Sequence, residues 1–115
     1  MIDLPLRGQI WLVSLDPAIG SEIKKTRPVL VISNDLNNQY AETVTILPIS
    51  DMGQKVYPFE VLLSSEDAGL NKPSKIKCQQ IRTVDKKRFI KPLGAIHKNL
   101  FPQVDQAIKT HLGID

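Results

Sequence analysis

The side chains best suited to chemistry in this 115-residue chain gather at one junction, where a polar loop meets an apolar run. Arg27 directly precedes Pro28, and Pro28 opens the run Pro-Val-Leu-Val-Ile-Ser. Proline disfavours helical geometry in the residue before it, so Arg27 is predicted to be extended, with Pro28 as the first residue of a buried strand. An arginine in that position can hydrogen-bond two phosphate oxygens at once. The alternative is a surface arginine that forms a salt bridge with Glu22 or Asp16.

The other reactive groups favour anion binding over metal-assisted or nucleophilic catalysis. His97 and His111 are the two histidines, they have no third partner at the spacing of metal ligands, and both are predicted to be structural. The chain contains no nucleophile elbow, no Gly-rich phosphate loop and no H-E-x-x-H pattern. The acidic residues are scattered, so we expect no metal site and no cofactor. Arginine, lysine, hydroxyl and amide groups remain, and this set suits contact with phosphate.

Basic residues cluster three times along a chain whose net charge is only +3. If the three clusters meet on one face of the fold, they form an anion-binding patch. Otherwise they are separate solvated groups, and the sequence leaves both possibilities open. The clusters are Lys24, Lys25 and Arg27; Lys72, Lys75 and Lys77; and Lys86, Lys87 and Arg88.

Length and composition are typical of one globular domain spanning residues 1–115. No window approaches the roughly 20 apolar residues of a membrane span, and the first residues do not resemble a signal peptide. Cys78 is the single cysteine, which excludes an internal disulfide and suits a reducing compartment. We therefore expect a cytoplasmic protein without a membrane partner.

Hydrophobic periodicity predicts a mainly β protein that ends in one α-helix. Helical spacing begins at Asn99, with Pro102 in the first turn and Gly113 as the stop signal. Pro48 suggests that its strand lies at an edge of the sheet or ends there. Several short strands and one terminal helix favour a small twisted barrel or curled sheet. The predicted strands span residues 8–15, 28–33, 43–49, 59–63, 74–80, 81–84 and 89–96; residues 34–40 form a turn or short helical turn, and 16–26, 50–58 and 64–73 are loops, the first of them mobile.

Residues 74–80 alternate clearly between apolar and polar side chains. Ile76 and Cys78 are predicted to point inward. Gln80 then falls on the inward side, where a buried amide needs partners, or a bulge breaks the register. The outward face is predicted to carry Lys75, Lys77 and Gln79.

Two blocks of the chain resemble the signatures of the MazF/PemK (Kid-like) toxin family. The first comprises Arg-Gly-Gln-Ile-Trp-Leu-Val-Ser-Leu-Asp-Pro at 7–17, Gly-Ser-Glu at 20–22 and Thr-Arg-Pro-Val-Leu-Val-Ile-Ser-Asn-Asp at 26–35. The second is Cys-Gln-Gln-Ile-Arg-Thr-Val-Asp-Lys at 78–86. The blocks occur in the family's order and separation, and the resemblance covers nearly the whole chain. It implies an SH3-like β-barrel with a C-terminal helix, the MazF/CcdB-like plasmid maintenance toxin fold, in a homodimer.

The resemblance also implies an activity and partners. It implies the toxin of a type II toxin–antitoxin system. Such a toxin is a metal-independent, sequence-specific endoribonuclease that cleaves single-stranded mRNA by attack of the RNA's 2′-hydroxyl group, and it thereby inhibits translation and growth. The implied protein partner is a cognate antitoxin whose acidic C-terminal tail blocks the RNA groove, and DNA would be bound only through that complex. Two alternatives are a toxin of the same fold that poisons DNA gyrase and a non-catalytic SH3-like binding module.

Residue by residue, the resemblance places the family's arginine on Arg27 and its hydroxyl residue, most often threonine, on Ser50. Arg27 would stabilise charge on the phosphate, with donation of a proton to the leaving oxygen as a second role. Ser50 would orient the phosphate or the 2′-hydroxyl, and the general base is unassigned. Some PemK-type members carry arginine and aspartate where this chain has Lys77 and Gln79, so the pattern is closer to the MazF type. The RNA-binding candidates are Glu22, Lys24, Lys25, Lys77, Gln79 and Gln80.

Overall fold

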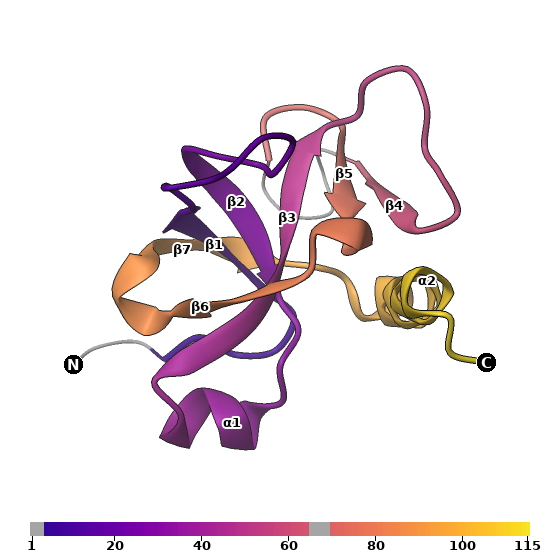
Figure 1. The fold of residues 1–115 in the computed structure, drawn as a ribbon. Coiled ribbons are helices and arrows are strands. Elements are labelled where there is room, and N and C mark those ends of the chain that lie inside the picture. Colours follow the sequence, from indigo (N-terminus) through magenta and orange to yellow (C-terminus); the bar gives the residue numbers. More distant parts are fainter. Residues whose placement is uncertain (1–3, 65–69) are drawn as a thin grey trace.

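A computed structural model describes residues 4–64 and 70–115, and its strands form one curled antiparallel sheet (Figure 1). The strand order is β4-β5-β3-β2-β1-β7, and β6 pairs separately with β3. The predicted class, mainly β with a C-terminal helix, is confirmed, although hydrogen bonds between the described strands do not close the sheet into a complete barrel. The elements are β1 (Gln9–Ser14), β2 (Thr26–Val31), α1 (Asp35–Tyr40), β3 (Thr43–Asp51), β4 (Glu60–Leu63), β5 (Ser74–Lys77), β6 (Arg82–Asp85), β7 (Phe89–Ala95) and α2 (Phe101–Leu112), with 3₁₀ turns η1 (Cys78–Gln80), η2 (Lys86–Arg88) and η3 (Lys98–Leu100).

β3 lies inside the sheet, where it pairs with β2, β5 and β6. The prediction that Pro48 marks an edge or a strand end is therefore wrong. One side of β3 pairs with β6 as far as Ile46 and then with β5 from Ile49 onward. Pro48 lies in the gap between these pairings, where a missing N–H breaks no ladder bond on that side. A proline is therefore tolerated in the middle of a central strand.

β2 begins earlier than predicted, at Thr26, so Pro28 is its third residue and Arg27 lies inside the strand. β2 pairs with β3 only over Val29–Val31, and Pro28 lies outside that pairing. Pro28 therefore interrupts no bond to β3. The backbone of Arg27 is held by β1, the strand on the other side of β2, because Arg27 pairs with Val13.

The strand predicted over residues 74–80 is too long, because β5 ends at Lys77 and η1 follows. Ile76 and Cys78 are fully buried, as predicted. The 3₁₀ turn breaks the alternation at the position where an inward-facing Gln80 would have needed partners. The side chains predicted to point outward are only partly exposed: Lys75, Lys77 and Gln79.

Both faces of the sheet are covered by core clusters. Ile10 belongs to a core cluster under α2, whereas Trp11 and Val13 belong to a second cluster on the other face. In Figure 1, α2 lies at one side of the sheet, and it contacts β4 and η1. The sheet is therefore buried on both faces beneath the loops that it connects.

α2 follows the predicted helical pattern over most of its length. Val104 and Ala107 are buried against the core, and Gly113 ends the helix with a φ of 70°. His111, which was predicted to be structural, is exposed near the end of the helix. At the other end of the chain, α1 confirms the short helical turn predicted for residues 34–40. The loop predicted for 64–73 falls largely on residues 65–69, which lie outside the described residues.

Candidate active site

A pocket of about 300 Å³ lies where the pairing of β2 with β3 ends, and both predicted catalytic residues line it. Val29 pairs with Pro48, so the same register continued by two residues sets Arg27 opposite Ser50. Directly opposed residues of antiparallel strands point to the same face of a sheet. The sequence separates these two residues widely, and the fold brings them together. The other lining residues are Thr26, Pro28, Ile49, Asp51, Leu70, Asn71, Lys72 and Ser74.

The Arg27 guanidinium retains hydrogen-bonding capacity. Its Nε donates to the carbonyl oxygen of Lys24 at 3.3 Å. The alternative of a salt bridge with Asp16 or Glu22 is not realised, because each of these carboxylates instead accepts a backbone N–H of its own loop at 2.8 Å. Among the described residues, Arg27 forms no ion pair. Its terminal nitrogens are therefore suited to an incoming anion.

Ser50 and two charged neighbours form the other wall of the pocket. Ser50 Oγ donates to the Asp51 carbonyl oxygen at 3.1 Å and keeps its lone pairs. The Asp51 carboxylate pairs with Lys72 Nζ at 3.0 Å, and both side chains are mostly exposed. Because a surface ion pair is weak, Lys72 is available as a second cation beside Arg27. The sequence placed Lys72 in a basic cluster and gave it no role in the site.

The predicted RNA-binding residues divide into two groups. Glu22, Lys24 and Lys25 are exposed in the loop between β1 and β2, and the side chain of Gln80 reaches that loop from η1. Lys77 and Gln79 lie at the end of β5, and neither is among the described residues that line the pocket. The set is therefore divided between two places, and only Glu22, Lys24 and Lys25 adjoin Arg27 in the chain.

Gln79 contacts a buried carboxylate that the sequence did not single out. The Glu60 side chain is 1% exposed, and its Oε2 accepts Gln79 Nε2 at 2.7 Å. Glu60 Oε1 pairs with Lys75 Nζ at 3.1 Å and accepts the Tyr57 N–H at 3.0 Å. Lys75 Nζ also donates to the Lys55 carbonyl at 2.9 Å. This network fastens the loop between β3 and β4 to β5. An acidic residue at the start of a strand, opposite a lysine-rich strand, was the signal available in the sequence.

The network also sets the protonation of its members. Burial by itself raises the pKa of Glu60, but the hydrogen bonds from Gln79 and the Tyr57 backbone, with the ion pair to Lys75, outweigh burial and lower this pKa overall. Burial, with a contribution from the Glu60 charge, raises the pKa of Cys78 to about 12. The Cys78 thiol is therefore not an activated nucleophile.

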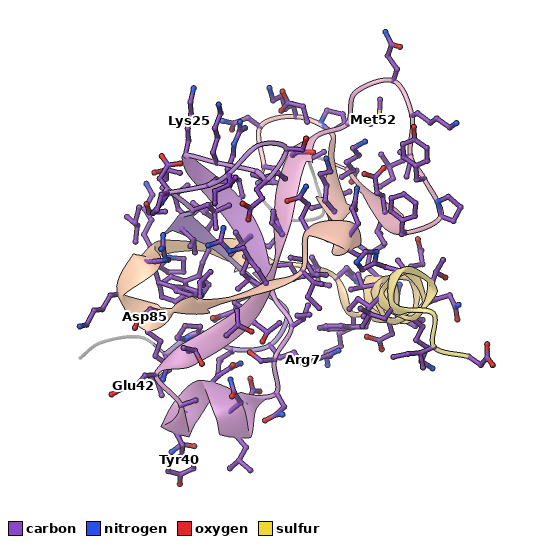
Figure 2. All side chains as sticks on the ribbon, viewed as in Figure 1. Arg7, Lys25, Tyr40, Glu42, Met52 and Asp85 are labelled. Carbon is purple, nitrogen blue, oxygen red and sulfur yellow. The ribbon has the colours of Figure 1, made fainter. Side chains whose placement is uncertain are left out.

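The three basic clusters do not form one continuous patch. Lys72 lines the pocket of Arg27, whereas Lys86 and Lys87 line a separate hollow with Tyr40, Ala41, Glu42 and Asp85. Figure 2 shows Lys25 at one end of the sheet and Tyr40 and Glu42 at the other. Only part of the positive charge is therefore placed to attract an anion to the pocket.

The described part of the chain offers neither a group of metal ligands nor a membrane-spanning helix. No group of three or more His, Cys, Asp or Glu residues there could hold a metal ion, and no helix there is long and apolar enough to span a membrane. Each histidine has a local contact: His97 Nδ1 accepts the Asn99 N–H at 3.2 Å, and the His111 ring lies 6.4 Å from that of Phe59.

Comparison with known proteins assigns the chain to a family. The model of the PemK-like, MazF-like toxins of type II toxin–antitoxin systems matches residues 6–112. The chain belongs to this toxin family. Among curated relatives, endoribonuclease MazF9 of Mycobacterium tuberculosis is 41% identical over 113 residues, covering 94% of this chain and 96% of that protein. Endoribonuclease MazF of Staphylococcus epidermidis is 36% identical over 110 residues, covering 95% of this chain and 92% of that protein.

Solved structures of toxins share the fold. MazF of Deinococcus radiodurans superposes with a TM-score of 0.84 at 24% identity, covering 98% of this chain and 100% of that one. A MazE–MazF structure from the same organism gives a TM-score of 0.78 at 23% identity, with the same coverage. The curled sheet with its C-terminal helix is thus the fold of MazF toxins.

Replacing Glu60 with Gln tests the buried network. The folded-state pKa of Glu60 is depressed, so its charge contributes stability above the unfolded-state pKa of about 4.3, and this contribution is lost as pH falls through the folded-state pKa. Glu60→Gln leaves Lys75 without a counter-ion and is expected to lower the free energy of unfolding by about 3 kcal/mol near neutral pH. The loss should shrink below about pH 4.

Urea unfolding across this pH range measures both effects. Asp51→Asn is the matched control, because the exposed pair of Asp51 with Lys72 should contribute less than about 1 kcal/mol. Equal losses for the two variants would contradict the special role of Glu60.

Proposed function

We propose that this protein is the toxin of a type II toxin–antitoxin system and acts as a sequence-specific endoribonuclease on single-stranded mRNA, inhibiting translation and growth. The observation that carries the proposal is the joint lining of one pocket by Arg27, which has no carboxylate partner among the described residues, and Ser50. The names of the curated relatives support RNA as the substrate. Action on mRNA implies a cytoplasmic protein.

In the proposed reaction, the substrate supplies its own nucleophile. The 2′-oxygen attacks the adjacent phosphorus in line, and the new O2′–P bond forms as the P–O5′ bond breaks. The 2′-hydroxyl loses its proton to a base that is still unassigned, and the 5′-oxygen gains one. The 2′-oxygen is already close to the phosphorus, so proximity supplies much of the rate without a metal-bound hydroxide.

Arg27 and Ser50 act on the phosphate in this scheme. Negative charge grows on the non-bridging oxygens, and a fixed cation at that place lowers the barrier. A guanidinium is a permanent cation at neutral pH, so the first role of Arg27 is electrostatic and donation to the leaving oxygen is second. Ser50 orients the phosphate or the 2′-hydroxyl group.

The remaining partners follow from the same proposal. Glu22, Lys24 and Lys25 contact the RNA from the loop before β2, and Lys77 contacts it from the end of β5, while Gln79 holds the buried Glu60 carboxylate beside this end. The toxin is a homodimer and is inhibited by a cognate antitoxin whose acidic C-terminal tail competes with RNA for the basic residues. DNA is bound only through that complex. The MazE–MazF structures of Deinococcus radiodurans, which share this fold, support a protein partner of this kind.

Removing the Arg27 guanidinium should abolish most of the activity. Loss of one donor to a developing oxyanion typically costs about 100- to 1000-fold in rate, so Arg27→Ala should lower kcat by that factor and retain the fold. Ser50→Ala should be milder, and Ser50→Thr should be near wild type. Cleavage of a long RNA under matched conditions measures the rates, and a folded Arg27→Ala variant with wild-type kcat would refute the assignment.

A single 2′-deoxy substitution tests the nucleophile. An oligonucleotide with one 2′-deoxy residue on the 5′ side of the cut bond should resist cleavage, whereas the all-ribose oligonucleotide is cut with EDTA present. The products should be a 2′,3′-cyclic phosphate, or the 3′-phosphate from its opening, and a free 5′-hydroxyl. A 5′-phosphate product, or undiminished cleavage of the deoxy oligonucleotide, would rule the mechanism out. Absence of any RNA cleavage would favour a gyrase poison or a binding module.

A further inference from the structure

The orientation of Arg27 depends on a loop carbonyl. The Arg27 side chain is long, and the hydrogen bond from its Nε to the Lys24 oxygen, at 3.3 Å, is the one that the described residues give it. The strand fixes the Arg27 backbone, whereas the guanidinium takes its direction from the position of Lys24. A catalytic group must be held to within roughly 0.5 Å, so whatever fixes Lys24 also affects catalysis.

Lys24 is held by contacts on both sides. On one side, the Ile23 N–H donates to Gln80 Oε1 at 3.2 Å. On the other, the Lys25 N–H donates to Asp16 Oδ1 at 2.8 Å. Lys25 also has a φ of 69°. Residues other than glycine and asparagine seldom adopt this left-handed backbone conformation without support. Lys24 therefore lies between two fastened neighbours.

Gln80 uses both ends of its amide on this loop. Its Oε1 accepts from Ile23, and its Nε2 donates to the Ser21 carbonyl at 3.3 Å. This pattern fastens a loop, because the two groups that an amide would offer to RNA are already engaged with backbone atoms. The contact spans 57 residues of sequence between Ile23 and Gln80, so it joins two distant segments of the chain.

Two arginine side chains that follow Gln80 in the chain hold the start of the same loop. Arg82 Nη1 donates to the Leu15 carbonyl at 3.4 Å. Arg88 Nη1 donates to the Ser14 carbonyl at 3.2 Å and also to the carbonyl of Asp16. The segment from η1 to η2 therefore supports the β1–β2 loop along its length, and Gln80 is the support nearest to Lys24.

We infer that Gln80 is a positioning residue for Arg27, acting through the backbone of the loop at Ile23 and Lys24. It is not a direct RNA ligand. The inference rests on the proposed role of Arg27 at the phosphate. It replaces the RNA-binding role that sequence reasoning gave to Gln80, and it gives the β1–β2 loop a function in catalysis as well as in binding.

The split between kcat and KM separates the two roles. Gln80→Ala should lower kcat about 10- to 100-fold and change KM by less than about threefold, because the guanidinium is misplaced while RNA contacts remain. Gln80→Glu keeps an acceptor for the Ile23 N–H and should recover kcat to within about fivefold of wild type, with a raised KM from the added negative charge. A rise in KM with unchanged kcat for Gln80→Ala would overturn the inference.

Two further single variants and one double variant extend the test, and Asp16→Ala does not depend on whether Gln80→Ala folds. Asp16→Ala removes the support on the other side of Lys24 and should also lower kcat selectively. Gln106→Ala, on the exposed face of α2, is the matched control and should change neither parameter. Adding Gln80→Ala to Arg27→Ala should cause no further loss in single-turnover assays with excess enzyme, because the two residues act as one unit. An additive further loss would contradict the inference.

The outcomes also distinguish this inference from the proposed function. If the wild-type protein cuts no RNA, or Arg27→Ala cuts at the wild-type rate, the proposed function fails. If Arg27→Ala is inactive while Gln80→Ala and Asp16→Ala both keep wild-type kcat, only the positioning role fails. Circular dichroism and thermal melting of each variant establish that the comparison is made between folded proteins.

Discussion

The register between β2 and β3 is the constraint on which the rest of the site depends. A slip of one residue would turn every side chain of a strand to the opposite face of the sheet. Here both faces are buried, since Leu30 packs under α2 while Val29 and Val31 pack on the other side. A slip would therefore be costly on either face, and the register that sets Arg27 opposite Ser50 is enforced by the core.

A fixed backbone is not enough to place a guanidinium, and the structure supplies a second level of support. The strand holds the Arg27 main chain through its pairing with Val13, while the side chain takes its direction from the preceding loop. That loop is fastened by side chains from the segment that follows β5. The two blocks of sequence that carry the family resemblance are thus in direct contact. The buried Glu60 supports the β3–β4 loop in a similar way.

The parts of the fold that depend on local pattern could be predicted from the sequence. The buried positions Ile76 and Cys78 and the helix stop at Gly113 follow from periodicity and from a backbone that favours glycine, and the structure confirms them. Pro48 was misplaced because local sequence cannot show that β3 changes partners at that point. The strand predicted through Gln80 was too long because alternation alone does not show where a 3₁₀ turn replaces the strand.

The candidate site could be predicted only in part, for a different physical reason. Arg27 was singled out by its position before Pro28, the resemblance gave catalytic roles to Arg27 and Ser50, and the structure shows that both residues line one pocket. The partners of Gln80 could not be predicted, because Ser21 and Ile23 lie in a loop without periodicity, far from Gln80 in the sequence. Hydrogen bonds of this kind become visible only when the loops are placed.

In the proposed mechanism Arg27 stabilises charge that develops in the transition state, so it should contribute little to binding of the RNA before reaction. The most direct test is the equilibrium affinity of the wild-type protein and of Arg27→Ala for an uncleavable RNA that carries one 2′-deoxy residue at the cut position. The account predicts dissociation constants within about threefold of each other, although the two proteins differ in cleavage rate by about 100-fold or more. A dissociation constant that rises by the same factor as kcat/KM falls would show that Arg27 binds RNA equally in the ground state, and would contradict the account.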